Sequence, residues 1–269
     1  MGVDKQKWNS VMKKYTFTVD DNIRVFREIT ERGYASIFEH PYLGMYKRLH
    51  DRFGVSVQLN LFYEMDDFDL SEMTDRYRDE WASVSNWLRM SFHSRLENVK
   101  PYEHSDYTEV RGDAEAVHRE ILRFAGEASL AKTTTIHYCR TTPDGVRAML
   151  DVGAVGLLGL YGTEKSPRTS YSLPEQLAAE ARRGGVVRCD GMAHASIDLI
   201  LNNVELDKIE ERLEPLLDRQ RVGLMIHEQY FYPDYERYQP DFEHKLSLAF
   251  SYMRDHGYES KFFENILDM

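Results

Sequence analysis

The chain has 269 residues, enough for one large domain or two small ones, and its composition of 42% hydrophobic and 29% charged residues is that of a folded protein. With 34 basic and 45 acidic residues it carries a formal charge of −11, which disfavours binding to nucleic acid or to an anionic membrane surface. The two cysteines, Cys139 and Cys189, form no CxxC pair, so neither a disulfide framework nor a thiolate zinc site is indicated.

The sequence indicates neither an N-terminal signal peptide nor a membrane-spanning segment. Residues 1–14 are polar and lack the apolar core of a signal peptide. No apolar run approaches the roughly 18 residues that a membrane-spanning helix needs. We therefore expect a cytoplasmic protein without membrane association; its oligomeric state is left open.

The first half of the chain alternates predicted strands and helices. Aromatic and β-branched residues predict a strand at 15–19, and Pro41 and Gly54 bracket a helix over 41–53. Asp113 is expected to cap a helix. In chain order the predicted elements are strand 15–19, helix 22–32, helix 41–53, strand 57–63, strand 87–92 and helix 113–124.

The second half continues the alternation. Gly184 and Gly185 break a predicted helix, and Asp207 with Glu210 resembles a capping box for another. In chain order the predicted elements are strand 133–136, helix 144–151, strand 154–160, helix 173–183, strands 186–189 and 197–201, a helix after 207, strand 222–226 and helix 241–256.

This alternation predicts an α/β fold with a mostly parallel sheet. About seven strands within the chain favour a single β/α barrel domain over residues 1–269, with an open doubly wound sheet as the alternative.

Polar residues that follow the predicted strands are the candidates for chemistry, because the carboxyl ends of parallel strands meet at one mouth. Two imidazoles and one carboxylate would bind a divalent metal and leave positions open for water and substrate. The strand-end residues are Asp20, Asp21, Glu64, His93, His137, Arg140, His227 and Glu228.

Other motifs in the sequence do not indicate a function. Gly156–Gly162 has the wrong glycine spacing for a dinucleotide fingerprint, and His227-Glu228 lacks the second histidine of a zincin helix. A tyrosine-rich stretch, made of Tyr230, Tyr232, Tyr235 and Tyr238, either stacks on sugar rings or forms an ordinary packed loop.

Three segments resemble the motifs of the polysaccharide deacetylases, the NodB-type carbohydrate esterases. Residues 17–22 (Phe-Thr-Val-Asp-Asp-Asn) resemble their first motif, T-F-D-D-G. Residues 91–95 (Ser-Phe-His-Ser-Arg) resemble the start of H-[S/T]-x-x-H. Residues 224–227 (Leu-Met-Ile-His) resemble the last motif, a strand followed by a histidine. The resemblance spans about residues 15–230 and implies a distorted seven-stranded β/α barrel.

The resemblance also implies roles for the matching residues: Asp20 as general base, Asp21 and His93 as metal ligands, and His227 as general acid. Asn22 replaces the usual glycine of motif one. The second histidine of motif two falls at Glu97, so the third ligand is expected from Glu97, His104 or His137, with His137 preferred. Arg140 is expected to stand in for the arginine of the family's R-P-P-Y segment.

The predicted function is a metal-dependent hydrolase that removes an acyl (acetyl) group from a carbohydrate or a related amide or ester. Its cofactor would be a divalent metal, with zinc as the expected ion. The substrate would be a small molecule or oligosaccharide contacted by Glu64, Arg140 and Glu228. Two alternatives remain: a glycosidase that pairs Asp20 or Asp21 with Glu64 or Glu228, and a non-catalytic carbohydrate-binding relative.

Overall fold

The computed structural model describes residues 12–96 and 102–267. Its strands form two sheets. The larger sheet consists of β1 (Lys13–Asn22), β2 (Val57–Met65), β3 (Phe68–Asp69), β4 (Leu88–Leu96), β9 (Leu199–Ile200), β10 (Arg221–His227) and β11 (Tyr258–Ser260). The smaller sheet consists of β5 (Thr133–Thr134), β6 (Gly156–Gly159), β7 (Val187–Cys189) and β8 (Met192–Ser196).

Most strand pairs are parallel. In the larger sheet β1 lies between β10 and β2, β2 also pairs with β4, and β10 pairs with β9. In the smaller sheet β6 lies between β5 and β8. Only β3 and β7 run antiparallel to their neighbours. The predicted α/β class with a mostly parallel arrangement is confirmed, whereas the strands are divided between two sheets.

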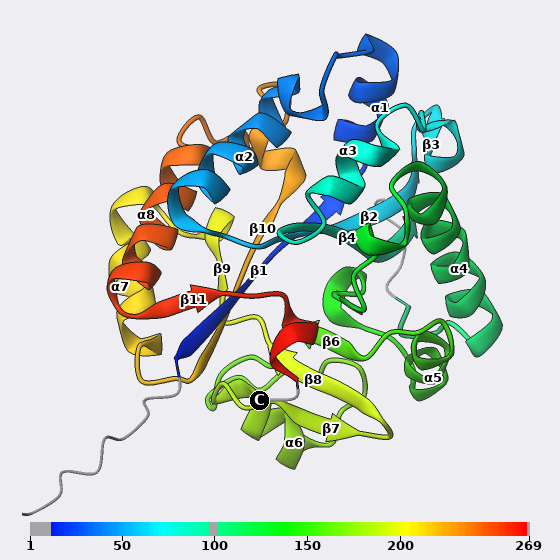
Figure 1. Cartoon of the computed structure of the whole chain (residues 1–269). Coiled ribbons are helices and arrows are strands. Elements are labelled where there is room, and N and C mark those ends of the chain that lie inside the picture. The colour runs from blue at the N-terminus through cyan, green and yellow to red at the C-terminus, as the bar shows by residue number, and fades with distance from the viewer. Residues whose placement is uncertain (1–11, 97–101, 268–269) are drawn as a thin grey trace, which may run out of the picture.

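Helices lie around the outside of the strands (Figure 1). Helices α2, α7 and α8 gather on one side and α4 and α5 on the other. The eight helices of the described residues are α1 (Arg24–Arg32), α2 (Pro41–Phe53), α3 (Arg78–Ser83), α4 (Tyr107–Phe124), α5 (Pro143–Asp151), α6 (Glu175–Arg182), α7 (Ile209–Leu213) and α8 (Phe242–Asp255). Gly54 ends α2 in the left-handed conformation, as expected from a glycine at this position.

The core lies between the strands and these helices. Because the central strands are covered on both faces, most residues of β1, β2 and β10 are buried, on both faces of the sheet. This leaves the strand ends as the places where polar side chains reach a cavity.

Two predicted helix caps are wrong. Helix α4 begins at Tyr107, where the Asp106 carboxylate accepts a hydrogen bond from the backbone N–H of Glu109 at 2.9 Å. Asp113 lies inside this helix and accepts a hydrogen bond from the Tyr102 hydroxyl instead. No side chain caps the start of α7, so the capping box expected at residues 207–210 does not form.

Four elements were not predicted: β3, α3, β8 and β11. Strand β8 has the sequence Met-Ala-His-Ala-Ser, which lacks the β-branched and aromatic residues that mark a strand, although all five residues are buried. The predicted strand 197–201 shrinks to β9, and the predicted strand 133–136 shrinks to β5. Among the described residues, no helix is both long and apolar enough to cross a membrane.

Candidate active site

A cavity of about 410 Å³ opens at the carboxyl ends of β1, β4 and β10. It collects five of the predicted site residues from four separate segments of the chain. Its polar and aromatic lining comprises Asp20, Asp21, His93, His137, Tyr138, Arg168, His227, Gln229, Tyr230, Tyr235 and Arg237.

A β-bulge allows two consecutive aspartates to line this cavity. Val19 pairs with Leu59 and Asn22 with Leu61, so β1 contains one more residue than β2 over this stretch. Asp21 has a φ of 65°, in the left-handed region. In a regular strand, neighbouring side chains point to opposite faces. The bulge removes this alternation and brings both Asp20 and Asp21 to the cavity.

Similar irregularities position the two histidines. Leu61 pairs with Phe92 and Phe62 with Ser94, so His93 is the extra residue of a bulge in β4. His137 lies in a 3-10 turn after β5, and the next two residues, Tyr138 and Cys139, have φ values of 58° and 56°. Non-glycine residues in this region are uncommon and cluster at functional sites. All three candidate ligands therefore lie at or next to distorted backbone.

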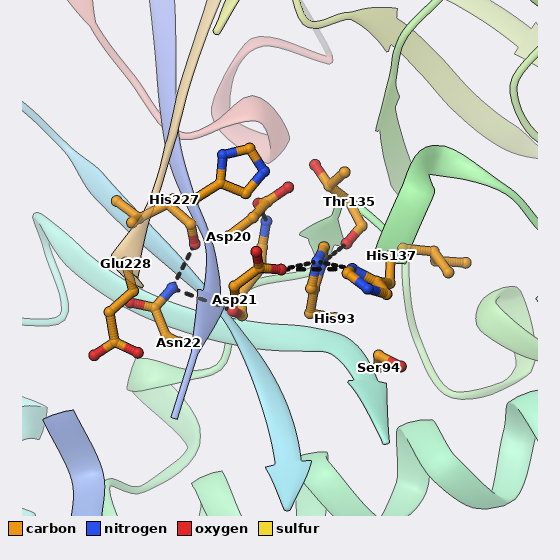
Figure 2. Close-up of polar contacts among 12 residues, drawn as sticks. Asp20, Asp21, Asn22, His93, Ser94, Thr135, His137, His227 and Glu228 are labelled. Carbon is orange, nitrogen blue, oxygen red and sulfur yellow. Dashed lines mark hydrogen bonds and ion pairs between the residues drawn. The ribbon is translucent and has the colours of Figure 1, made fainter. Parts of the chain in front are cut away.

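Asp21, His93 and His137 converge on one point (Figure 2). The Asp21 Oδ1 atom is 3.1 Å from His93 Nε2 and 3.4 Å from His137 Nδ1. The two histidine nitrogens are 3.0 Å apart. Donor atoms that each lie about 2.1 Å from one ion are about 3.0–3.4 Å apart in octahedral or tetrahedral geometry. The three donors fit a divalent metal.

The hydrogen bonds of this cluster favour metal binding. Nδ1 of His93 donates to the backbone carbonyl of Thr135, so a neutral His93 presents an unprotonated Nε2 to Asp21 and His137. Fixing the second nitrogen of a ligating histidine in this way is common in metal sites. The other oxygen of Asp21, Oδ2, accepts a hydrogen bond from Gln229 at 2.8 Å, which orients the carboxylate.

The electrostatics of the cluster also suit a cation. Burial opposes ionisation of Asp21, but the rings of His137 and His93, when protonated, hold the pKa of its carboxyl well below the usual range. Burial lowers the pKa of His137. For His93, burial alone would lower the pKa, but the charges of Asp20 and Asp21 and the hydrogen bonds of the ring raise it.

Asp20 lies beside the cluster and is buried. Its Oδ1 accepts a hydrogen bond from the Asn60 side chain at 2.7 Å. Burial raises the pKa of Asp20, although His93 and His227 act in the opposite direction. Asp20 is therefore a carboxylate whose affinity for a proton is increased, as a general base requires.

His227, at the end of β10, is oriented by a second asparagine. Its Nδ1 is 2.9 Å from Asn202 Oδ1, and Asn202 Nδ2 donates to Asn203 Oδ1 at 3.1 Å. Because the amide nitrogen of Asn202 is engaged elsewhere, its oxygen faces His227 and Nδ1 carries the proton. The Nε2 atom of His227 is left for the cavity.

Glu228, the next residue, points away from the cluster (Figure 2). Its carboxylate is buried and accepts hydrogen bonds from the backbone N–H groups of Ile23, Arg24 and Val25 at 2.8, 3.1 and 2.8 Å. It thus caps the N-terminus of α1 from a distant part of the chain. Glu228 does not line the cavity, so its position does not support the expected contact with substrate.

The remaining candidates lie outside the cluster. Glu64 is 3.5 Å from Arg95, Arg140 pairs with Glu103, and neither lines the cavity. Arg140 is exposed and follows the turn at Tyr138 and Cys139. His104 is exposed and pairs with Glu103. The alternative ligand Glu97 lies outside the described residues.

Sequence reasoning did not identify Asn60, Asn202, Thr135 or Gln229. Gln229 could have been predicted, because it lies two residues after His227 at the same strand end. Asn60 lies inside β2, and Thr135 acts through its backbone carbonyl. No sequence motif marks a polar residue inside a strand or a residue that acts through its backbone carbonyl.

Solved structures share this fold. A putative polysaccharide deacetylase from Mycobacterium smegmatis matches 97% of this chain and 91% of its own, with a TM-score of 0.58 and 12% identity. The chain shares the fold of a polysaccharide deacetylase. A 4-α-glucanotransferase from Thermococcus litoralis matches 96% of this chain with a TM-score of 0.60 and 13% identity; this chain spans 40% of its length.

A family 4 acetyl xylan esterase from Clostridium thermocellum, in complex with a cobalt ion, matches with a TM-score of 0.49 and 12% identity over 95% of this chain and 91% of its own. No family model and no curated protein matches the sequence. The similarity to the Mycobacterium smegmatis structure confirms, at the level of the fold, the resemblance to polysaccharide deacetylases that the sequence indicates.

Proposed function

We propose that this protein is a metal-dependent hydrolase that removes an acyl group, such as acetyl, from a carbohydrate or a related amide or ester. The observation that carries the proposal is the convergence of Asp21, His93 and His137 in one cavity with Asp20 and His227. This combines three metal donors with a buried carboxylate and a histidine whose tautomer is fixed.

We also infer that the two sheets form the wall of one distorted barrel of about seven strands in a single domain, as expected from the sequence. Two sets of hydrogen bonds support this inference. The N–H of Ala131, just before β5, donates to Met90 O of β4 at 2.8 Å. After β8, the N–H groups of Ile197 and Asp198 donate to Gly159 O of β6 and Gly223 O of β10, both at 2.8 Å.

Asp21, His93 and His137 would hold the metal, and we propose zinc, which accepts mixed nitrogen and oxygen ligands. A bound divalent metal polarises a carbonyl group and lowers the pKa of water. Nothing else in the proposal depends on the identity of the ion.

Asp20 and His227 would move the protons. Asp20, held by Asn60, accepts a proton from the water that attacks the acyl carbon. His227, held by Asn202 through its Nδ1–H, acts in the imidazolium form, in which Nε2 also carries a proton, and donates that Nε2 proton to the leaving nitrogen or oxygen.

The glycosidase alternative finds less support. A glycosidase needs two carboxyl groups on opposite sides of the scissile bond. Neither Glu64 nor Glu228 lines the cavity, which leaves only the adjacent pair Asp20 and Asp21. A carbohydrate-binding relative without turnover differs from the proposed enzyme in releasing no acyl group.

The test combines metal analysis with acetate release. Protein purified without a histidine tag is expected to hold about one equivalent of transition metal and to release acetate from acetylated sugars. His93→Ala and His137→Ala should lose both properties. His104→Ala, which removes an exposed histidine outside the cluster, is the matched control. Acetate release that persists after complete chelation would overturn the metal-dependent mechanism, and glycan binding without metal or turnover would support the binding relative.

A further inference from the structure

The outer part of the cavity carries positive charge. Arg168 and Arg237 both line it, together with Tyr138, Tyr230 and Tyr235. The only acidic residues among the described lining are Asp20 and Asp21. The chain as a whole carries a net charge of −11, so the two arginines of this cavity contrast with the overall charge of the protein.

Neither arginine is neutralised by a strong partner. Arg168 Nη2 donates to the backbone carbonyl of Tyr138 at 2.7 Å, and no ion pair within residues 12–96 and 102–267 includes Arg168. Among the described residues, the one ion pair of Arg237 is with its neighbour in sequence, Glu236, at 3.5 Å, with both side chains more than two-thirds exposed, and its guanidinium also lies beside the neutral Tyr230 hydroxyl. An ion pair of this kind contributes little. Both guanidinium groups remain available to a ligand.

The charge balance strengthens this reading. When Asp21 and the two histidines hold a divalent cation, the charges of the two aspartates are balanced. The two arginines then give the cavity a net positive charge, which attracts an anion. Guanidinium groups bind carboxylates and phosphates through paired hydrogen bonds.

Aromatic side chains supply the rest of a sugar site. Tyr138 is 46% exposed, and its ring centroid is 4.1 Å from that of the candidate ligand His137. Tyr230 and Tyr235 pack edge to face at 5.1 Å on the segment that follows β10. Tyrosine offers an apolar face and a polar hydroxyl, a combination that suits a pyranose ring.

We propose that the substrate is an anionic sugar, whose carboxylate or phosphate group pairs with Arg168 and Arg237 while its ring lies against the tyrosines. This inference rests on the proposed function and names the substrate class of the same site. Two of the four tyrosines of the tyrosine-rich stretch, Tyr230 and Tyr235, then have a role in binding, whereas Tyr232 is buried and donates a hydrogen bond to Glu228.

The experiment measures binding by calorimetry with matched pairs of probes. A hyaluronan tetrasaccharide, which carries carboxylates, is compared with neutral N-acetylchitotetraose. N-Acetylglucosamine 6-phosphate is compared with N-acetylglucosamine. The protein is the Asp20→Asn variant, so that turnover does not interfere. The anionic member of at least one pair should bind about tenfold more tightly at low salt, as expected for charge-assisted hydrogen bonds. The pair that shows the preference identifies carboxylate or phosphate as the acid group.

Arg168→Gln and Arg237→Gln, introduced into the same background, should each lose most of this preference without changing the affinity for the neutral probes. Arg254→Gln is the matched control, because Arg254 also forms an ion pair with its neighbour in sequence, Asp255, and does not line the cavity. Equal binding of anionic and neutral sugars would overturn the proposal, as would a preference that survives in the double variant Arg168→Gln/Arg237→Gln.

The result is separable from that of the proposed function. If the protein prefers anionic sugars but the wild type releases no acetate, the anion site stands and the hydrolase fails. If it deacetylates neutral and anionic sugars equally, the hydrolase stands and the anion site fails.

Discussion

The carboxylate of Glu228 accepts a hydrogen bond from the backbone N–H of Ile23 at 2.8 Å, and so ties the end of β10 to the start of α1. The two segments carry His227 and the Asp20–Asp21 pair. Their relative position therefore depends on a carboxylate that does not itself reach the cavity.

This contact makes stability depend on pH. Burial raises the pKa of Glu228 from 4.5 to about 7. Between pH 4.5 and about pH 7, Glu228 has lost its carboxyl proton in the unfolded chain but retains it in the folded protein. The contribution of Glu228 to the unfolding free energy therefore falls as the pH rises. Glu228→Gln cannot ionise. The unfolding free energy of the wild type relative to Glu228→Gln should therefore decrease by about 3 kcal/mol between pH 5 and pH 8. Denaturant titrations of both proteins at about pH 5 and pH 8 measure these free energies. If the difference between the two proteins is the same at both pH values, the raised pKa of Glu228 is contradicted. Glu64→Gln serves as the control.

Removal of the general base or acid should affect turnover and leave metal binding intact. Asp20→Asn and His227→Ala should each lower kcat by about 10²–10⁴-fold, the usual contribution of a positioned acid or base. Elemental analysis should find the same metal content as in the wild type, because neither residue belongs to the Asp21, His93 and His137 cluster. Near-normal turnover in both variants would exclude these roles.

Asn202 should act through His227. Asn202→Ala removes the acceptor for Nδ1 and should lower kcat by about 10–100-fold, the typical effect of losing a partner that orients a functional histidine. KM should change little. Asn202→Asp, which keeps the acceptor oxygen, should restore most of the activity. Steady-state kinetics distinguish this from a folding defect, which would lower the amount of active enzyme in both variants.

Metal binding should stabilise the fold. At 100 times its dissociation constant, a ligand that binds only the folded state adds about 2.7 kcal/mol. Addition of zinc to chelator-treated protein should therefore raise the Tm by about 5 °C for a chain of this size. His93→Ala should show no increase, whereas His104→Ala should match the wild type. An equal increase in His93→Ala would place the metal elsewhere.

Gly223 should be sensitive to any side chain. A Cβ atom at this position of β10 would lie 2.3 Å from the backbone oxygen of Ser196, at the end of β8. Gly223→Ala should lower the unfolding free energy by at least about 1–3 kcal/mol, the usual cost of overpacking. Gly112 lies in α4 with nothing within 4 Å of an added Cβ, so Gly112→Ala should instead stabilise by about 0.5–1 kcal/mol. Thermal denaturation of both variants tests the close approach of the two sheets.

Much of the site can be predicted from the sequence, because functional residues of a parallel sheet lie at the carboxyl ends of its strands. Asp20, Asp21, His93, His137 and His227 all follow apolar runs, and the structure brings them to one cavity. The same rule selects Glu228, Glu64 and Arg140, which lie elsewhere. Strand-end position fixes where a residue lies, but not the direction of its side chain. His227 and Glu228 are neighbours that point in opposite directions.

The parts that were not predicted depend on contacts between distant segments. Asn60 and Asn202 become recognisable only when β2 and the segment after β9 lie next to Asp20 and His227. Strand β8 has almost no local signal, because it lacks β-branched and aromatic residues, and its pairing with β6 and β7 is visible only in the folded protein. The bulges at Asp21 and His93 follow from pairing register, which periodicity does not encode.

The extra residue of β1 also suggests how such a protein could lose its activity. The extra residue belongs to the Asp20 and Asp21 pair, so deleting it would restore the regular alternation of side chains and leave a single aspartate at the cavity. Descendants of the same ancestor could in this way keep the scaffold and abandon turnover in a single step.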